Sequence, residues 1–285
     1  MFGKSVAALI LVLAGASAVT AEPAKPAKPP EPAKPDPKAA PAKAAKPRAK
    51  AAAKTVKAAK AKKPAGRPHA TSRFDAPADA ETTPAVRYGA LDQVACEAEL
   101  DARQISYAPE SAPGVAEPVR LTQPLHGVTF RTDEPESKRA TTPYEISDCR
   151  LVLALDDFAA VLEKHDVVEV RHYSMYRSPG NAWPEGKAAA QHADGLAIDA
   201  GRFLRKDGTT LAVDSVFHGA IDAKTCGEGA GPKPATPDAL ELREILCDTV
   251  AQHLFNVVLT PNFNKPHHNH FHLEVTAGVK WFLVH

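Results

Sequence analysis

Apolar residues along this chain follow two spacings, and each spacing predicts a different kind of element. Between residues 91 and 105 they recur at the spacing of one helix face. They are Leu91, Val94, Ala95 and Leu100. The segment 167–176 is rich in β-branched and aromatic residues and predicts a strand. The turn sequence KDG at 206–208 separates the runs 197–204 and 210–213, which predicts a hairpin.

The rest of the pattern adds further helices and strands. Asp156 or Asp157 can cap a helix that runs to Lys164, and Pro237 opens another that runs to about residue 255. Short strands are expected over 128–130, 256–259 and 268–275, the last one closing the domain, and a loop over 106–124. Helices mixed with hairpins predict an α+β domain in which helices flank a small antiparallel sheet.

The N-terminus has the pattern of an export signal. Lys4 supplies a positive start, and residues 6–14 form an apolar run that is too short to span a bilayer. Small-residue cleavage sites follow, and the one ending at Ala21 is favoured because Glu22 comes next. We therefore expect a signal peptide over residues 1–21 and an exported protein of the periplasm or cell envelope. The alternative is an uncleaved membrane anchor; no apolar run is long enough for a multi-pass membrane protein.

A linker is expected over residues 22–86, before a domain over 87–285. As far as residue 70 the linker is built of Ala, Lys and Pro, with no Leu, Ile or aromatic residue, so it cannot bury enough apolar surface to fold. Residues 22–70 contain 14 Lys and Arg against 3 Asp and Glu, whereas residues 71–285 contain 20 against 31. The linker is either a tether to an anionic envelope polymer or a plain spacer. The acidic remainder argues against nucleic-acid binding.

Four cysteines, Cys96, Cys149, Cys226 and Cys247, follow the linker. None forms a CxxC pair, which argues against a thiolate zinc knuckle. In an oxidising compartment an even number favours disulfides, and three pairings are possible. We favour Cys96 with Cys149 and Cys226 with Cys247, because each pair closes a modest loop.

Imidazole and carboxylate groups gather in two segments. On the strand expected over 268–275, His268, His270 and His272 would share one face. His192 and Asp199 are seven residues apart, so His192 must lie in a turn before the strand, with Gly195 at the bend. If that turn folds back, two imidazoles and a carboxylate meet. Such a set leaves the fourth tetrahedral position of a zinc ion open.

Three segments in this order resemble the zinc peptidases of peptidoglycan. They are Tyr176-Arg177-Ser178, the segment HADGLAID at 192–199, and the segment VLTPNFNKPHHNHFHL at 258–273. The superfamily comprises D-alanyl-D-alanine carboxypeptidases, lysostaphin-type and murein endopeptidases and the hedgehog N-terminal domain. Within it the bacterial extensin-like C-terminal domain is most similar, and the resemblance covers roughly residues 90–285.

The resemblance implies roles for individual residues. His192, Asp199 and His272 would be the zinc ligands, and His270 would support a ligand or act in catalysis. Arg177 would orient the substrate carbonyl or stabilise the oxyanion, for which a permanently charged guanidinium is suited.

Three positions depart from the family patterns. Asn269 stands where the carboxypeptidases have a Glu general base, Ala190 where they have a Ser, and Tyr176 where the extensin-like pattern has a Cys. We therefore expect an imidazole as the base, with His270 as first choice and His267 as second. Glu274 lies two residues beyond His272 and could reach the site, but we expect it to be a solvated carboxylate at the strand end.

Together with the metal site expected from the residues, the resemblance implies a zinc-dependent peptidase that hydrolyses stem-peptide or cross-link bonds of peptidoglycan through metal-activated water. The main alternative is a non-catalytic cell-wall-binding protein in which zinc is structural, and a periplasmic zinc buffer is a third. A fourth protein ligand such as His268 would favour a structural metal. An open position that faces a groove would favour hydrolysis.

Overall fold

The folded part of the chain begins before the domain boundary expected from the sequence. The computed structural model describes residues 74–179 and 190–285, so the expected signal peptide and most of the expected linker lie outside the described residues. The first elements are β1 (Phe74–Asp75), η1 (Ala80–Thr82) and α1 (Pro84–Gly89). β1 pairs with β11 (Phe282–Val284), and Phe282 packs on Ala80, Ala85 and Val86. The boundary expected at Arg87 therefore falls inside α1.

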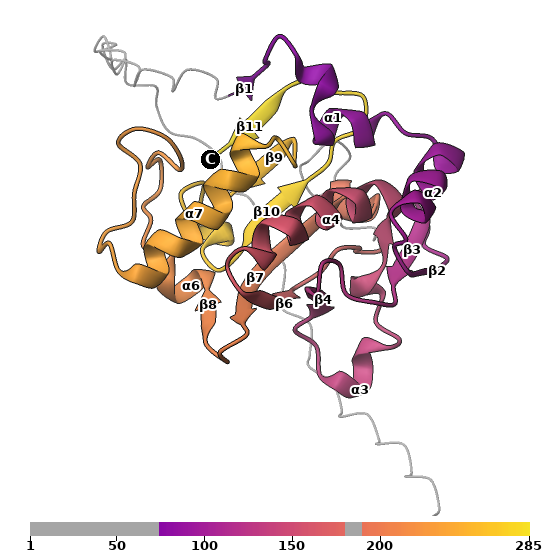
Figure 1. The fold of residues 1–285 in the computed structure, drawn as a ribbon, viewed down its shortest axis with the longest axis horizontal. Helices are drawn as coiled ribbons and strands as arrows, with labels where there is room; N and C mark the ends of the chain where they lie inside the picture. The colour runs from indigo at the N-terminus through magenta and orange to yellow at the C-terminus, as the bar shows by residue number, and fades with distance from the viewer. Residues whose placement is uncertain (1–73, 180–189) are drawn as a thin grey trace, which may run out of the picture. The chain divides into compact units, whose positions relative to one another are not determined.

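The main sheet is larger than expected and mixed rather than antiparallel. Its eight strands include the order β1-β11-β9-β10-β7-β6-β4, and β8 pairs with β7 (Figure 1). The strands not yet given are β4 (Thr129–Thr132), β6 (Val167–His172), β7 (Ala197–Arg205), β8 (Thr210–Ala212), β9 (Val257–Leu259) and β10 (Phe271–Glu274). β4 pairs with β6, and β11 with β9, in parallel. The expected hairpin is confirmed as β7 and β8.

The end of the chain and residues 106–124 differ from expectation. The strand expected over 268–275 begins only at Phe271, because η3 (Lys265–His267) and a turn precede it, and β11 follows it as the last strand. The expected loop contains two strands of a second sheet. This sheet comprises β2 (Tyr107–Pro109), β3 (Pro118–Leu121) and β5 (Ser147–Asp148). Pro109 and Pro118 lie at strand ends, where a missing backbone N–H is tolerated.

Two long helices, α4 (Cys149–Glu163) and α7 (Pro237–Ala251), lie side by side over one face of the main sheet (Figure 1). α4 begins seven residues before the expected cap, because Asp148 accepts a hydrogen bond from the Arg150 amide as its N-cap. Asp156 and Asp157 lie inside α4 instead, where both pair with Arg103. α2 (Gln93–Ala102) confirms the helix expected over 91–105. The other short helices are α3 (Glu136–Arg139), α5 (Ala190–Ala193), α6 (Val213–Val216) and η2 (Pro143–Glu145).

The alternation of side chains in β7 and β10 separates the core from the polar side of the sheet. Phe271 packs against Phe203 and Phe217, and Phe158 of α4 also packs against Phe203. Because neighbouring residues of a strand point to opposite faces, His272 is directed away from this cluster. Within the described ranges, no helix is long and apolar enough to cross a membrane.

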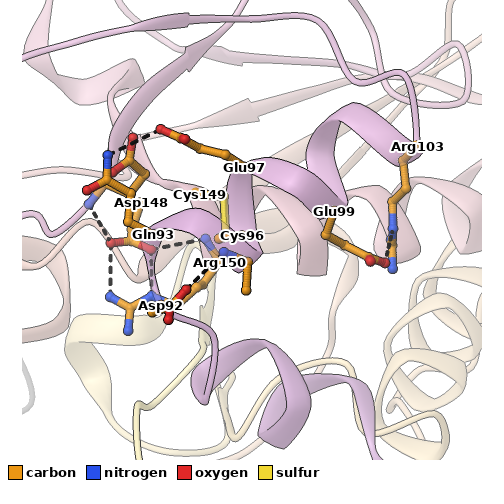
Figure 2. The surroundings of a disulfide bond; sticks show 11 residues. Asp92, Gln93, Cys96, Glu97, Glu99, Arg103, Asp148, Cys149 and Arg150 are labelled. Atoms are coloured by element: carbon orange, nitrogen blue, oxygen red, sulfur yellow. Dashed lines mark hydrogen bonds and ion pairs between the residues drawn. A yellow bond between two sulfur atoms is a disulfide. The ribbon is translucent and has the colours of Figure 1, made fainter.

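Both favoured disulfides are present. Cys96–Cys149 joins α2 to the first residue of α4, and Cys226–Cys247 joins the segment before α7 to α7 itself. Figure 2 shows the first bond beside Asp148, whose carboxylate holds Arg150. The amide of Asp148 donates to the Gly195 carbonyl at 2.9 Å, so this anchored helix start supports the turn at Gly195.

Loop closure predicts unequal contributions of the two disulfides to stability. The bonds close loops with sequence separations of 53 and 21 residues. The chain-entropy relation gives losses of about 4 kcal/mol for Cys96→Ala/Cys149→Ala and about 3 kcal/mol for Cys226→Ala/Cys247→Ala. Urea unfolding of each double variant, compared with the parent, measures the loss in the free energy of unfolding. A larger loss for the Cys226/Cys247 variant would contradict the loop-closure account.

Candidate metal centre

The pairing of two strands places a carboxylate and an imidazole opposite each other. β7 and β10 are antiparallel, and their register puts Asp199 directly across from His272. Directly opposed residues have Cβ atoms about 5 Å apart and share a face of the sheet. The register therefore brings together two of the three expected ligands, although 73 residues separate them in the sequence.

A tight turn adds the third side chain. His192 lies in α5, and the chain reverses through Gly195, whose φ is +67°. A Cβ at Gly195 would lie 2.8 Å from the backbone nitrogen of Asp148, so only glycine fits between the turn and the start of α4. The turn directs His192 back toward the strand that follows it, as expected from the sequence.

The three side chains converge on one carboxylate oxygen. Nε2 of His192 and Nδ1 of His272 each lie 3.1 Å from Oδ1 of Asp199. Each of the three residues is at most 4% exposed. One ligand atom from each residue falls in a group that is no more than 4.8 Å across. This buried group can hold a metal ion.

The remaining imidazole nitrogens determine where the lone pairs point. Nδ1 of His192 lies 3.0 Å from the carbonyl oxygen of Met175, and Nε2 of His272 lies 3.1 Å from Oε2 of Glu274. Both oxygens are acceptors, so each imidazole must donate its N–H there. In neutral rings the lone pairs of the other nitrogens then face Asp199 Oδ1. Three acceptors directed at one point fit a bound cation.

Glu274 differs from its expected environment. It is 5% exposed rather than solvated, and its second oxygen accepts a hydrogen bond from the Thr276 hydroxyl at 2.6 Å. A carboxylate that is held in this way fixes the ring orientation and tautomer of the histidine it accepts from. Glu274 therefore belongs to the site as the partner of His272.

The pKa shifts of the three residues indicate which side chain carries a proton when no metal ion is bound. Burial alone would raise the pKa of Asp199, but the imidazoles of His192, His270 and His272 beside its carboxylate outweigh burial and hold this pKa well below its usual range. Burial lowers the pKa of His192. Burial also opposes charge on His272, yet its bonds to Asp199 and Glu274 raise its pKa to about 9. The positive charge that the three acceptors require thus rests on His272.

Arg177 contacts the same carboxylate from its other side. Its Nη2 pairs with Oδ2 of Asp199, and its Nε donates to the Ser174 hydroxyl at 2.7 Å. Asp199 therefore uses Oδ2 for the guanidinium and Oδ1 for the two imidazoles. The expected role of Arg177 toward a substrate carbonyl stays a prediction.

Two of the three other histidines in the segment 267–272 lie at the site. Nε2 of His270 is 3.4 Å from Asp199 Oδ1, and the His267 ring centroid is 5.1 Å from that of His270. Burial, followed by the neighbouring imidazoles, lowers the pKa of His267 to about 4. His268 is exposed, with its Nδ1 on the Lys265 carbonyl, because residues 268–270 precede the strand and do not alternate along it.

A groove of about 400 Å³ opens over this group. Its polar wall contains the three candidate ligands together with Arg177, His267 and His270. Leu259, Phe263 and Pro266 contribute its apolar side, beside Asn264. The candidate ligands therefore border a space that can admit a small molecule or a peptide segment.

Of the residues that support the site, Ser174 and Met175 were not predicted from the sequence, and Glu274 was expected in solvent. Ser174 accepts a hydrogen bond from Arg177, the Met175 carbonyl accepts one from His192, and Glu274 accepts one from His272. Only Glu274 carried a usable signal, since even spacing from His272 puts both side chains on the same face of the strand. No family model matches this chain, and neither a curated protein nor a solved structure matches it.

The partner role of Glu274 predicts a change in metal affinity. Glu274→Gln keeps the shape of the side chain but weakens the acceptor for His272 Nε2–H, so affinity for Zn²⁺ should fall about 10–100-fold. Competition with a chromophoric chelator measures the dissociation constant, and Glu244→Gln on the exposed side of α7 is the matched control. Equal affinities for both variants would exclude this role.

Proposed function

We propose that this protein is a zinc-dependent peptidase that acts on peptidoglycan stem peptides or their cross-links. The observation that carries the proposal is that the buried group His192, Asp199 and His272 borders a groove that also contains two further imidazoles and a guanidinium. The ordered motifs at 176–178, 192–199 and 258–273, which resemble peptidoglycan peptidases, supply the substrate class.

Zinc suits the donor set of the group. Two imidazole nitrogens and one carboxylate oxygen are borderline ligands that Zn²⁺ accepts in tetrahedral geometry. Mg²⁺ and Ca²⁺ prefer sites built of oxygen atoms. A zinc ion held by three protein ligands keeps one position for water or substrate, and when bound it supplies an acidified water and polarises a carbonyl group.

The chain's own residues then divide the work of hydrolysis. Arg177 holds Oδ2 of Asp199 and lines the groove, where its positive charge stabilises an oxyanion. His270 accepts a proton through Nε2 and passes it to the leaving amine. His267, whose depressed pKa keeps it neutral near pH 7, lies beside His270 as a hydrogen-bonding partner for substrate. The apolar wall of Leu259, Phe263 and Pro266 packs against small side chains of the peptide.

Export and envelope attachment belong to the same proposal. An N-terminal signal over residues 1–21 would deliver the protein to the periplasm or cell envelope, and the basic segment over 22–70 of the expected linker would bind an anionic envelope polymer. The two disulfides are typical of an oxidising compartment and support this placement.

A second candidate function is a cell-wall-binding protein with structural zinc. Asn269 favours it, because this residue replaces the Glu base of the carboxypeptidases. Against it, His268 points its Nδ1 to a backbone carbonyl and does not supply a fourth ligand in the group. Hydrolysis is therefore the better-supported function.

Incubation of the zinc-loaded full chain with cross-linked muropeptides, followed by mass spectrometry, tests the proposal. We expect cleavage that a chelator abolishes and Zn²⁺ restores. His272→Ala should lose both zinc and activity, whereas His270→Ala should keep zinc and lose about 10²–10⁴-fold in kcat, the usual contribution of a general base. An unchanged kcat in His270→Ala would contradict its role, and intact muropeptides after incubation with the zinc-loaded parent would contradict hydrolysis.

A further inference from the structure

Asn269 and Tyr173 form a hydrogen-bonded pair at the edge of the site. Nδ2 of Asn269 donates to the phenol oxygen of Tyr173 at 3.1 Å, and Oδ1 of Asn269 lies 2.9 Å from Nδ1 of His270. Because the amide nitrogen is used for the phenol, its oxygen is left to accept from the imidazole. Asn269 therefore links a residue beside β6 to the imidazole that the proposed function uses as base.

The position of the His270 ring is fixed from a second direction. The Tyr173 ring meets the His270 ring edge to face, with centroids 5.8 Å apart and an interplanar angle of 86°. Such a contact is favourable because the ring edge is positive and the face negative. Two separate contacts with Tyr173, one through the amide and one direct, thus orient the same imidazole.

β7 contains a residue whose small size makes room for this arrangement. A Cβ at Gly201 would lie 3.2 Å from Cε2 and Cζ of Tyr173 and 3.3 Å from its hydroxyl oxygen. These distances are closer than ordinary van der Waals contact, so a side chain at residue 201 would displace the phenol. The absence of a side chain at Gly201 therefore leaves room for the Tyr173 ring.

We propose that Tyr173 and Asn269 are positioning residues that hold His270 with its proton on Nδ1 and its Nε2 lone pair toward the metal group. The donor–acceptor arithmetic supports this, since Asn269 Oδ1 can only accept and therefore requires the N–H of His270 at Nδ1. Nε2, 3.4 Å from Asp199 Oδ1, is then free to accept a proton from substrate or solvent. The catalytic consequence rests on the proposed function, whereas the tautomer itself does not.

The pair also gives a role to the residue that departs from the carboxypeptidase pattern. Asn269 stands where those enzymes have their Glu base. An amide cannot act as a base, but it can accept one hydrogen bond and donate another. In this chain the residue would orient the base instead of serving as one.

Nitrogen-15 NMR of the zinc-loaded full chain labelled at histidine tests the tautomer, with His270→Gln used to assign its signals. We expect His270 to carry its proton on Nδ1 in the parent and in Asn269→Asp, which keeps an acceptor. Asn269→Leu, of similar size but with no acceptor, should lose this single tautomer. His270 signals that are identical in the parent and Asn269→Leu would overturn the proposal.

Kinetics on muropeptides tests the consequence. Asn269→Leu should lower kcat about 10–100-fold with little change in KM and with zinc content unchanged, and Asn269→Asp should recover most of the loss. Tyr173→Phe and Gly201→Ala should cause smaller losses, whereas Tyr144→Phe, at an exposed tyrosine, is the matched control. Equal losses in Asn269→Asp and Asn269→Leu would overturn the positioning role. A parent that cleaves nothing would refute the proposed function, while the NMR result would still decide the tautomer.

Discussion

Three acceptor atoms are directed at one buried point in this protein, and the surrounding structure is arranged to keep them there. Asp199 Oδ1 lies 3.1 Å from a nitrogen of each of two imidazoles, and the opposite nitrogen of each imidazole is committed to an oxygen acceptor. Without a positive charge between them, three such atoms would repel one another at low dielectric. The group therefore requires a proton or a metal ion, and a divalent ion satisfies all three acceptors together.

Strand pairing and one tight turn bring the three candidate ligands together. Antiparallel pairing of β7 with β10 sets Asp199 opposite His272, while the alternating residues Ile198, Phe271 and Leu273 fill the core on the helical side. The turn through Gly195 is held against the start of α4, where Cys149 is tied to α2 (Figure 2). The same packing that stabilises the domain thus holds the three candidate ligands in place.

Much of the candidate site follows from local sequence rules. The odd spacing of His192 and Asp199 required a turn, and Gly195 indicated where it lies. The modest loop that each pair closes indicated the disulfide pairing that the structure has. Parallel pairing of β11 with β9 was not predictable, because it joins strands whose partners are set by tertiary contacts. Asp148 was overlooked as the N-cap of α4, since the apolar run after it lacks helical periodicity and Asp156 offered an alternative cap.

The supporting shell of the site was harder to predict than the ligands. Tyr173 and Asn269 meet although 96 residues separate them, and no local pattern marks that contact. Glu274 looked solvated because it ends a strand, but β9 pairs alongside it and buries the strand end. Metal ligands can be recognised in a sequence because clusters of histidine and acidic residues are unusual. The residues that orient them are common polar types, and only the fold shows that they contact the ligands.

The central claim is that a single ion is held by one atom from each of three residues. A crystal of the zinc-soaked protein, measured on both sides of the zinc absorption edge, tests it most directly. The account predicts one anomalous peak within bonding distance of His192 Nε2, Asp199 Oδ1 and His272 Nδ1, with solvent as the remaining ligand. A peak elsewhere in the chain, or a fourth protein ligand that closes the coordination sphere, would contradict it.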